Sequence, residues 1–504
     1  MRHGAHHDYV IIGSGIAGCV MANRLSQDPD TSVLLLEAGP DVGADPRVAT
    51  PARWPELLLS EYDWAYRTVP QTHLNGRRIN WPRGRAVGGS TALHAMVYIR
   101  GHATDFDAWA RFGGDDWTYD RLLPWFERAE DETAVHGSLS VREQDTPHPL
   151  AEAFVEAGEQ LGFPRNRDFN GTRQHGVGFY RVMQRHGLRC SAADAYLAPA
   201  AHRPNLTILP GTKVSTILLE SGRATGVRVW HSGTTLDIHA AREVVLCAGT
   251  IESPHLLMLS GIGPADHLRR VGVFPRVDLP GVGANLHDHV QVSVSLACRD
   301  TFPIAASSNL GEAGGFLSTA GDDSPPDVQL SFAPMRNLNA GTDFGNGLTI
   351  GPAVTRPVSR GRLTLTSADP WTAPAIDPGY LTRPEDLRTL VDGVTVALAL
   401  ARTPALSAHI DGDGGWDDRT DLEEFCRNNA ETQFHPVGTC RLGTDDNAVV
   451  DPSLRVRGVD GLRVVDASVI PAVTTGNISA PVFALAEKIA AQITGSTRTT
   501  AAIA

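Results

Sequence analysis

A glycine-rich turn between two apolar strands, near the start of the chain, constrains the fold more than any other feature. Residues Tyr9–Ile12 are apolar and β-branched, which predicts a buried strand. They lead into Gly13–Gly18, a GxGxxG sequence, and residues 19–25 then carry the apolar spacing of a helix face. Ser32–Leu36 predicts a second buried strand. This order of elements is typical of a dinucleotide-binding βαβ unit.

Each glycine of this turn has a physical task. Gly13 makes the tight turn, Gly15 lets backbone N–H groups approach a pyrophosphate, and Gly18 lets the helix pack closely on the strand. Glu37 follows about 20 residues later, where an acid binds ribose hydroxyls. The acid favours FAD or NAD over NADP, and the motif alone does not choose between the first two.

The composition predicts a folded globular protein. The chain has 504 residues, of which 42% are apolar and 20% charged, and it is long enough to bury a large core. Its net charge is −13. That charge argues against a protein that coats nucleic acid or an anionic membrane, so no nucleic-acid partner is expected. The oligomeric state stays open.

The cysteines and the hydropathy of the chain allow predictions about metal binding and cellular location. The six cysteines are scattered and none forms a CxxC pair, so we predict free thiols, no metal site and a reducing compartment. The strand beginning at Tyr9 leaves no room for a signal peptide, and no run of 18 apolar residues predicts a membrane span. The expected location is the cytoplasm.

Further unusual segments follow in the rest of the chain. The first contains Gly88-Gly89-Ser90, which by itself would be explained as a turn and a helix N-cap. The complete set comprises Trp81–Gly101, Cys247–Pro264, Leu279–His289, Phe434–Gly443 and Gly461–Pro481.

Together with the first turn, these segments resemble the glucose–methanol–choline (GMC) family of flavin oxidoreductases. The match covers nearly the whole chain in order. The resemblance implies FAD and an α/β fold, α+β overall. It combines a Rossmann-like FAD-binding domain, built from discontinuous segments, with a substrate domain that carries an antiparallel sheet. We expect residues 1–290, with inserted cap segments, and 445–504 to form the first domain, and residues 291–444 the second.

The resemblance also implies which residues contact FAD. It places residues of the Gly88–Val97 segment along the flavin, and Val214 at the adenine. The full set of candidate cofactor residues is Gly13, Ser14, Gly15, Ala17, Gly18, Glu37, Ala38, Gly88, Gly89, Ser90, His94, Ala95, Met96, Val97, Val214, Ala248, Gly249, Asp466, Ala467, Asn477 and Ile478.

Oxidation of an alcohol by a flavin needs a base beside the hydroxyl group, because the O–H proton leaves as the hydride does. His435 stands where the family keeps its catalytic histidine, so the resemblance implies that it is the base. Asn477 stands at the family's second active-site position, where an amide holds the substrate oxygen. Residues Pro481–Ile493 predict a helix directly after it.

His94 departs from the family pattern, which often has Asn at this position. Members with covalent FAD carry the linking histidine one residue earlier, where this chain has Leu93. We therefore predict non-covalent FAD. The Leu-His-Ala-Met sequence is similar to the branch of the family that contains pyridoxine 4-oxidase and other oxidases of aromatic primary alcohols.

The leading functional hypothesis is oxidation of a primary alcohol to an aldehyde, with the flavin reoxidised by O2 or a quinone-type acceptor. A choline dehydrogenase-like enzyme is an alternative, and a non-redox hydroxynitrile lyase is another. Choline would need aromatic faces or an acid around its ammonium group. Phe332, Trp371 and Trp416 are aromatic candidates, although such residues more often belong to the core.

Overall fold

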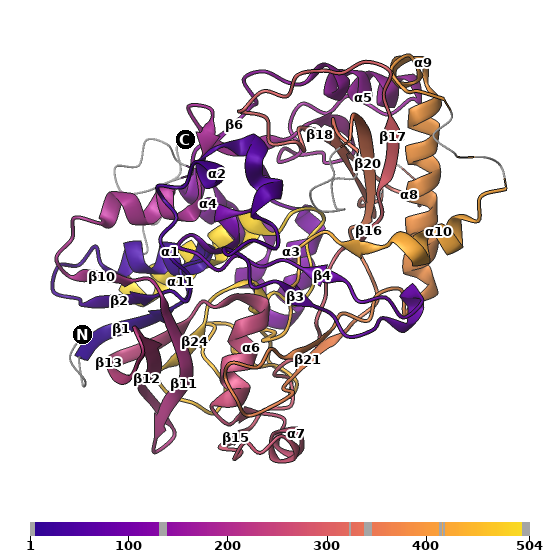
Figure 1. Ribbon diagram of the computed structural model, residues 1–504. Helices are drawn as coiled ribbons and strands as arrows, with labels where there is room; N and C mark the ends of the chain where they lie inside the picture. Colours follow the sequence, from indigo (N-terminus) through magenta and orange to yellow (C-terminus); the bar gives the residue numbers. More distant parts are fainter. Residues whose placement is uncertain are drawn as a thin grey trace.

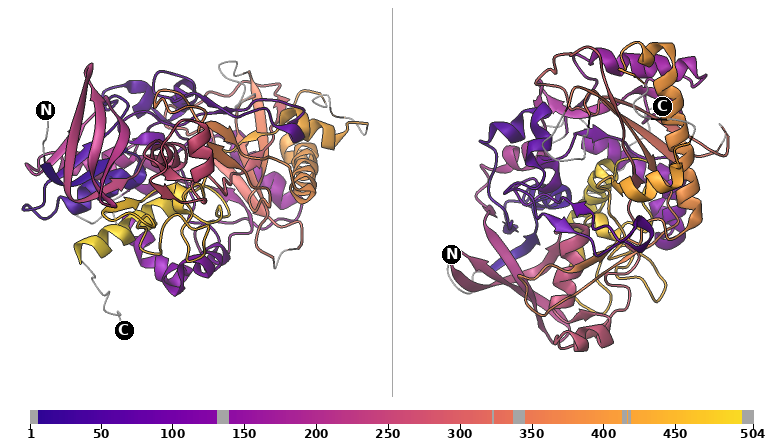
Figure 2. Two further views of the ribbon diagram at one scale, coloured as in Figure 1. Left: turned by 90° about the horizontal axis from the view of Figure 1, so that it is seen from below. Right: turned by 45° about the vertical axis from the view of Figure 1, so that its right-hand side comes forward.

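The computed structural model describes residues 6–130, 139–321, 324–336, 345–412, 416 and 419–495. Two seven-stranded sheets dominate these residues. Figure 1 shows the first sheet at the lower left and the second at the upper right, with helix α11 (Ser479–Thr494) in the middle of the molecule. Both views in Figure 2 keep the two sheets at opposite ends.

The first sheet contains the predicted βαβ unit. Its strand order is β10-β2-β1-β13-β12-β11, with β24 also paired to β13. Strands β10, β2, β1, β13 and β24 are parallel neighbours, whereas β11 to β13 form an antiparallel meander. The bounds are β1 His6–Ile12, β2 Val33–Leu36, β10 Leu206–Leu209, β11 Thr212–Glu220, β12 Arg223–His231, β13 Thr234–Leu246 and β24 Leu462–Val464.

Helix α1 (Ile16–Leu25) joins β1 to β2 and packs on α11. The predicted strand, helix and strand are therefore confirmed, although β1 starts earlier than expected, in the polar residues before Tyr9. Gly18 has the expected packing role. A Cβ atom there would lie 1.8 Å from the carbonyl oxygen of Gly13, so only glycine fits between helix and turn.

The second sheet is antiparallel throughout, as the family resemblance implies. Its order is β23-β16-β20-β19-β18-β7, with β17 also paired to β20. Helices α5 (Pro149–Gln160) and α8 (Pro384–Arg402) pack against it. The bounds are β7 Gly176–Phe179, β16 Val290–Gln291, β17 Val294–Ala297, β18 Ala313–Leu317, β19 Val328–Ala333, β20 Gly347–Val354 and β23 Glu431–Thr432.

Shorter elements surround the two sheets. The other helices are α2 Pro46–Ala49, α3 Ala103–Gly113, α4 Tyr119–Glu130, α6 Gly249–Leu259, α7 Ala265–Arg270, α9 Pro404–Ser407 and α10 Leu422–Asn429. The small sheets contain β3 Tyr66–Arg67, β4 Asn80–Trp81, β5 Val97–Tyr98, β6 Val141–Arg142, β8 Arg181–Arg185, β9 Leu188–Arg189, β14 Ile262–Gly263, β15 Val277–Asp278, β21 Arg362–Thr364 and β22 Ala375–Asp377.

The domain boundaries at 290 and 444 stay predictions. Strand β7 comes from the first predicted segment yet joins the second sheet, which fits a cap segment inserted into residues 1–290. Among the described helices, none combines the length and apolar character that crossing a bilayer requires. All six cysteines are buried and unpaired, as predicted.

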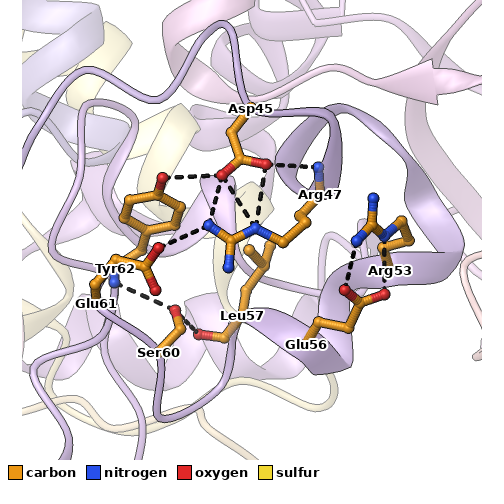
Figure 3. Close-up of polar contacts among 8 residues, drawn as sticks. All are labelled: Asp45, Arg47, Arg53, Glu56, Leu57, Ser60, Glu61 and Tyr62. Atoms are coloured by element: carbon orange, nitrogen blue, oxygen red, sulfur yellow. Dashed lines mark hydrogen bonds and ion pairs between the residues drawn. The ribbon is translucent and has the colours of Figure 1, made fainter.

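The segment from Asp45 to Trp64 lies along the edge of the main cavity, into which Trp54, Leu58 and Trp64 project. Figure 3 shows the hydrogen bonds and ion pairs by which polar side chains connect different parts of this segment. Asp45 accepts hydrogen bonds from the backbone N–H and guanidinium of Arg47 and from the hydroxyl of Tyr62, at 2.6–3.2 Å. Partly exposed pairs of this kind contribute up to about 1 kcal/mol each, so they shape the segment more than they stabilise the fold.

Candidate active site

One cavity, partly open to solvent, extends from the first sheet to the second. Its wall includes Ile12 at the end of β1 and Gln329 in β19. The end of β1 lies at the carboxyl edge of the parallel strands, which is where open α/β sheets bind ligands. A long ligand could therefore run from the βαβ turn to the face of the antiparallel sheet.

Three helices begin at the wall of this cavity. The residues that precede them, Gly15 before α1, Ala248 before α6 and Ile478 before α11, all line it. None of the three residues caps its helix with its own side chain, although at α6 the Asp466 carboxylate accepts from the N–H of Gly249 at 2.9 Å. Free N–H donors and the positive ends of the helix dipoles attract anionic groups. The cavity thus has the electrostatics that a ligand with a pyrophosphate needs.

Gly15 leaves open the space that such a ligand would fill. A Cβ atom at this position would have no protein atom within 4 Å, although the residue lies at the start of a helix. The backbone of Gly89 packs directly against Gly15 on another side. A Cβ atom on Gly89 would lie 2.6 Å from the Cα of Gly15, so Gly89 also needs to be glycine. The residues present therefore fit a dinucleotide that passes close to the backbone at Gly15.

Glu37 directly follows β2 and lines the cavity. Its carboxylate accepts hydrogen bonds from the N–H of Ser14 (2.9 Å), the hydroxyl of Ser14 (2.7 Å) and the N–H of Gly39 (2.8 Å). Burial raises the pKa of Glu37, and these hydrogen bonds oppose the shift. A carboxylate has about four acceptor positions, so capacity remains for a ribose hydroxyl. That role stays a prediction.

Most of the predicted cofactor residues lie in the cavity wall. Ser14, Gly18 and Gly88 do not; they support the wall from behind, Ser14 through its bonds to Glu37. The predicted residues that line the cavity are Gly13, Gly15, Ala17, Glu37, Ala38, Gly89, Ser90, His94, Ala95, Met96, Val97, Val214, Ala248, Gly249, Asp466, Ala467, Asn477 and Ile478.

The two predicted catalytic residues meet at the second-sheet end of the cavity. Asn477 Nδ2 lies 3.0 Å from His435 Nε2, although 42 positions separate the residues in the chain. Asn477 directly precedes Ile478 and helix α11, which confirms the predicted helix and starts it at Ser479. An amide donor and an imidazole nitrogen at this distance can share one hydroxyl group between them.

Adjacent buried groups hold His435 in place. Asp288 accepts a hydrogen bond from the backbone N–H of His435 (2.9 Å), and its other oxygen accepts from the hydroxyls of Thr432 (2.7 Å) and Tyr380. The guanidinium of Arg83 donates to the carbonyl of Phe434 at 2.8 Å. Phe434 itself has φ +68°, a strained conformation for a large side chain, and such strain is typical of functional sites.

The environment of His435 makes it a weak base that is neutral at physiological pH. Burial lowers its pKa well below 6.5, and His289, Arg83 and His94 lower it further. The nearest carboxylate, Asp288, is bound to the backbone rather than to the ring. A protonated imidazole cannot accept the alcohol proton.

The account predicts how activity depends on pH. Since the pKa of His435 lies below 6.5, kcat/KM for an alcohol should stay level as pH falls from neutrality to 6.5 and decline only at lower pH. The measurement is anaerobic flavin reduction by the alcohol at a series of pH values. The decline on the acid side of this profile reports the pKa of the base. An acid limb centred above pH 6.5 would contradict this environment for the base.

Uncharged amides surround the catalytic pair. Gln329 Nε2 donates to Asn477 Oδ1 at 3.3 Å, and Gln433 Nε2 donates to Gln329 Oε1 at 3.2 Å. Gln291 and Ser331 line the cavity beside them. The aromatic candidates Phe332, Trp371 and Trp416 do not line it. Phe332 packs in the core against Phe154, Trp371 contacts Trp230 at the surface, and Trp416 packs on Phe425.

Sequence reasoning missed Gln291, Gln329, Asp288 and His289. A signal was available for Gln329, because Gln329 and Ser331 alternate with apolar residues along β19 and so share one face. The segment containing Asp288 and His289 was recognised as unusual, but its pairing with His435 depends on a contact between residues about 150 positions apart.

Comparisons with known proteins identify the family of this chain. Two family models described as GMC oxidoreductase match residues 7–291 and 357–486. The chain is 38% identical to "Alcohol dehydrogenase [acceptor]" of Pseudomonas putida, over 96% of this chain and 95% of that protein. It is 41% identical to "Oxygen-dependent choline dehydrogenase" of Paraburkholderia xenovorans, over 97% and 94%.

A solved structure has the same fold. It is the crystal structure of pyridoxine 4-oxidase from "Mesorbium loti", with a TM-score of 0.90 and 36% identity over 97% of this chain and 99% of that one. The family models cover more than half of the chain, and the relatives exceed 30% identity over nearly all of it. The chain therefore belongs to the GMC oxidoreductase family and is an FAD-dependent enzyme that oxidises CH–OH groups.

Proposed function

We propose that this chain oxidises a neutral primary alcohol to an aldehyde, with His435 as the base and Asn477 as the group that holds the substrate oxygen. The observation that carries the proposal is the 3.0 Å contact between Asn477 Nδ2 and His435 Nε2 in the cavity wall. When bound along the three helix N-termini, FAD supplies the acceptor for the hydride of the carbinol carbon.

The two side chains divide the work on the hydroxyl group. The alcohol oxygen accepts a hydrogen bond from Asn477 Nδ2, and its proton passes to His435 Nε2. Gln329 fixes the amide of Asn477 by donating to its oxygen, so the NH2 group faces the base. Burial of His435 keeps water from competing for its lone pair and keeps the imidazole neutral before the proton arrives.

The groups that line the cavity near His435 support a neutral substrate over choline, because they are amides and the cation Arg83 rather than carboxylates. The acidic residues that line the cavity are Glu37, Glu252 and Asp466, and each lies in the nucleotide-binding region. Glu252 and Asp466 are paired with other groups, through Tyr66 and His255 and through Ser253 and Gly249 respectively. The amides beside His435 offer hydrogen bonds but no charge, so a quaternary ammonium held there by aromatic rings such as Tyr180 and Phe434 would have no carboxylate partner.

Replacing Gln291 by Glu should shift the preference toward choline. Gln291 is buried beside the catalytic end of the cavity, and a carboxylate there would attract a cation in a medium of low dielectric. We expect the ratio of kcat/KM for choline to that for a neutral alcohol to rise at least about tenfold, which corresponds to about 1.4 kcal/mol. The measurement is steady-state kinetics at mildly alkaline pH, where the new carboxyl group is ionised.

Gln291→Met is the matched control, because it keeps a similar volume without charge. Its preference should equal that of the wild-type protein. A wild-type enzyme that already prefers choline over every neutral alcohol would contradict the proposed substrate class.

An anaerobic stopped-flow screen tests the reaction itself. Benzylic, furanic, pyridoxine-like, choline-like and sugar alcohols are mixed with the protein, and bleaching of the flavin absorbance is followed before air is admitted. Bleaching by an alcohol supports oxidation. A flavin that stays oxidised while a hydroxynitrile is cleaved would support the lyase instead. The response to air separates O2 from a quinone-type acceptor, which the proposal leaves open.

The proposal includes non-covalent FAD and a cytoplasmic location. Leu93 offers no linking group. The Nδ1 atom of His94 accepts from the N–H of Met96 at 3.1 Å and lies 3.1 Å from a guanidinium nitrogen of Arg189, so this nitrogen is engaged with the protein. Burial and Arg189 lower the pKa of His94 to about 3. The six buried thiols support a reducing compartment.

A further inference from the structure

His289 is a fully buried imidazole that touches the proposed base. Its Nδ1 lies 2.9 Å from His435 Nδ1, and the two ring planes are perpendicular. We propose that His289 is a positioning residue that fixes the tautomer of His435, so that the lone pair of His435 Nε2 faces the alcohol. This inference rests on the proposed function, in which His435 is the base.

The protonation of His289 follows from its other neighbour. His289 Nε2 lies 3.0 Å from the carbonyl oxygen of Thr355, which can only accept a hydrogen bond. On this contact we assign the ring proton of His289 to Nε2. Burial lowers the pKa of His289 to about 4, although the carbonyls of Thr355 and Thr474 oppose the shift, so the ring is neutral and has one N–H. Its Nδ1 is left as an acceptor.

The carbonyl of Thr355 is a fixed anchor. The backbone N–H of Thr355 donates to the carbonyl of Asp327 at 2.9 Å, and its hydroxyl donates to the carbonyl of Pro326 at 3.0 Å. Thr355 is fully buried and directly follows β20. Because the backbone N–H and the side chain of Thr355 are both bonded to residues 326–327, its carbonyl keeps its direction toward His289.

The acceptor of His289 sets the tautomer of His435. Since His289 Nδ1 has no proton, His435 Nδ1 must donate the hydrogen of the 2.9 Å contact, which leaves Nε2 of His435 bare. The other side of the ring agrees with this assignment. Asn477 directs its NH2 group at Nε2, because its oxygen is occupied by the N–H of Gln329.

The backbone register explains why these two rings meet. His287 and Val437 exchange a pair of backbone hydrogen bonds in antiparallel register. The register then shifts by two residues, because Val290 pairs with Thr432 and the N–H of Gln433 donates to the carbonyl of His289. His435 lies within this shift, where its ring meets that of His289. Asp288, between them, binds the backbone N–H of His435. Consecutive residues thus hold the main chain and the ring of the base.

The groups around the two histidines indicate that His289 acts as a neutral acceptor and not as a source of negative charge. Arg83 and His94 act on His435 and lower its pKa, and the carboxylate of Asp288 faces the backbone. A neutral acceptor at Nδ1 holds the ring in one tautomer without adding negative charge. His289 therefore orients the base and accepts from its N–H while the second proton arrives at Nε2.

Two substitutions of His289 test the proposal. His289→Leu removes the acceptor, and loss of the correct tautomer should lower the limiting rate of anaerobic flavin reduction by about 100-fold or more, while the alcohol Kd changes less than about threefold. His289→Asn places an amide oxygen near the position of Nδ1, so it should recover at least about tenfold of that rate. Equal impairment of both variants, or a change in Kd alone, would overturn the proposal.

Leu296→Ala in β17 is the matched control. It removes a buried aliphatic side chain from the same sheet without touching either histidine, so it should lower stability and leave the limiting rate unchanged. A slow Leu296→Ala variant would show that general loosening of the sheet explains the His289 result, which counts against a specific role.

A direct readout of the tautomer keeps the proposal testable if the His289 variants do not fold. The wild-type holoenzyme is labelled with ¹⁵N-histidine, and the ring of His435 is identified by its loss in His435→Gln. At neutral pH we expect a protonated Nδ1 and a bare Nε2. A proton on Nε2 would refute the role of His289 while leaving FAD-dependent oxidation intact. Undiminished flavin reduction in His435→Ala would instead reject the proposed function, independently of the tautomer.

Discussion

Alanine in place of His435 should slow the anaerobic reduction of bound FAD by an alcohol about 10²- to 10⁴-fold, the contribution that a positioned general base makes to catalysis. The remaining neighbour of the alcohol would be Asn477, whose amide cannot accept a proton at neutral pH. The limiting rate is measured by stopped-flow absorbance with saturating alcohol.

The control must separate loss of the base from loss of the cofactor. His435→Ala should retain the flavin content of the wild-type protein, because the helix N-termini and Gly15 lie in other parts of the cavity wall. His409→Ala removes a histidine that packs against Phe302 outside the cavity, and it should reduce its flavin at the normal rate. An unimpaired His435→Ala enzyme would show that another group takes the proton.

Leucine in place of Gly15 should give a folded protein without flavin. The backbone at Gly15 has φ −69°, which leucine adopts without strain, and a Cβ there meets no protein atom within 4 Å. The side chain would therefore extend into the space where the pyrophosphate is expected. We predict a loss of FAD affinity of at least about 100-fold, or more than about 2.7 kcal/mol. The measurements are the flavin-to-protein absorbance ratio and the melting temperature of the apoprotein.

Gly43→Leu is the comparison for this variant. Gly43 lies in an exposed turn, where the nearest neighbour of an added Cβ is the Asp41 carboxylate at 3.4 Å, so a leucine there should leave flavin binding unchanged. A yellow Gly15→Leu protein with full flavin content would mean that the dinucleotide does not pass this turn.

Local pattern was enough to predict the nucleotide-binding end of the fold. The β1–α1–β2 unit is continuous in sequence, and its strands are apolar because both faces are buried. Helix α11 was also predictable, and its start at Ser479 places Pro481 in the first turn, where the missing N–H of proline costs no hydrogen bond.

The catalytic end depends on contacts that no local pattern encodes. His435 and Asn477 were identified by family resemblance, and their contact brings together two separate loops. The role of His289 requires the shifted pairing between residues 287–291 and 431–437, as well as the carbonyl of Thr355. Likewise, Ser14 and Gly88 stand in motifs that bind nucleotides, yet the backbone turns them behind the cavity wall.

The central claim is that this cavity holds FAD beside a base that deprotonates an alcohol. The most direct measurement mixes the purified yellow protein with a benzylic alcohol in the absence of oxygen and records flavin absorbance and aldehyde together. The account predicts complete bleaching with one aldehyde formed per flavin. A protein that contains no flavin and binds none when FAD is added, or a flavin that stays oxidised with every alcohol of the screen, would contradict it.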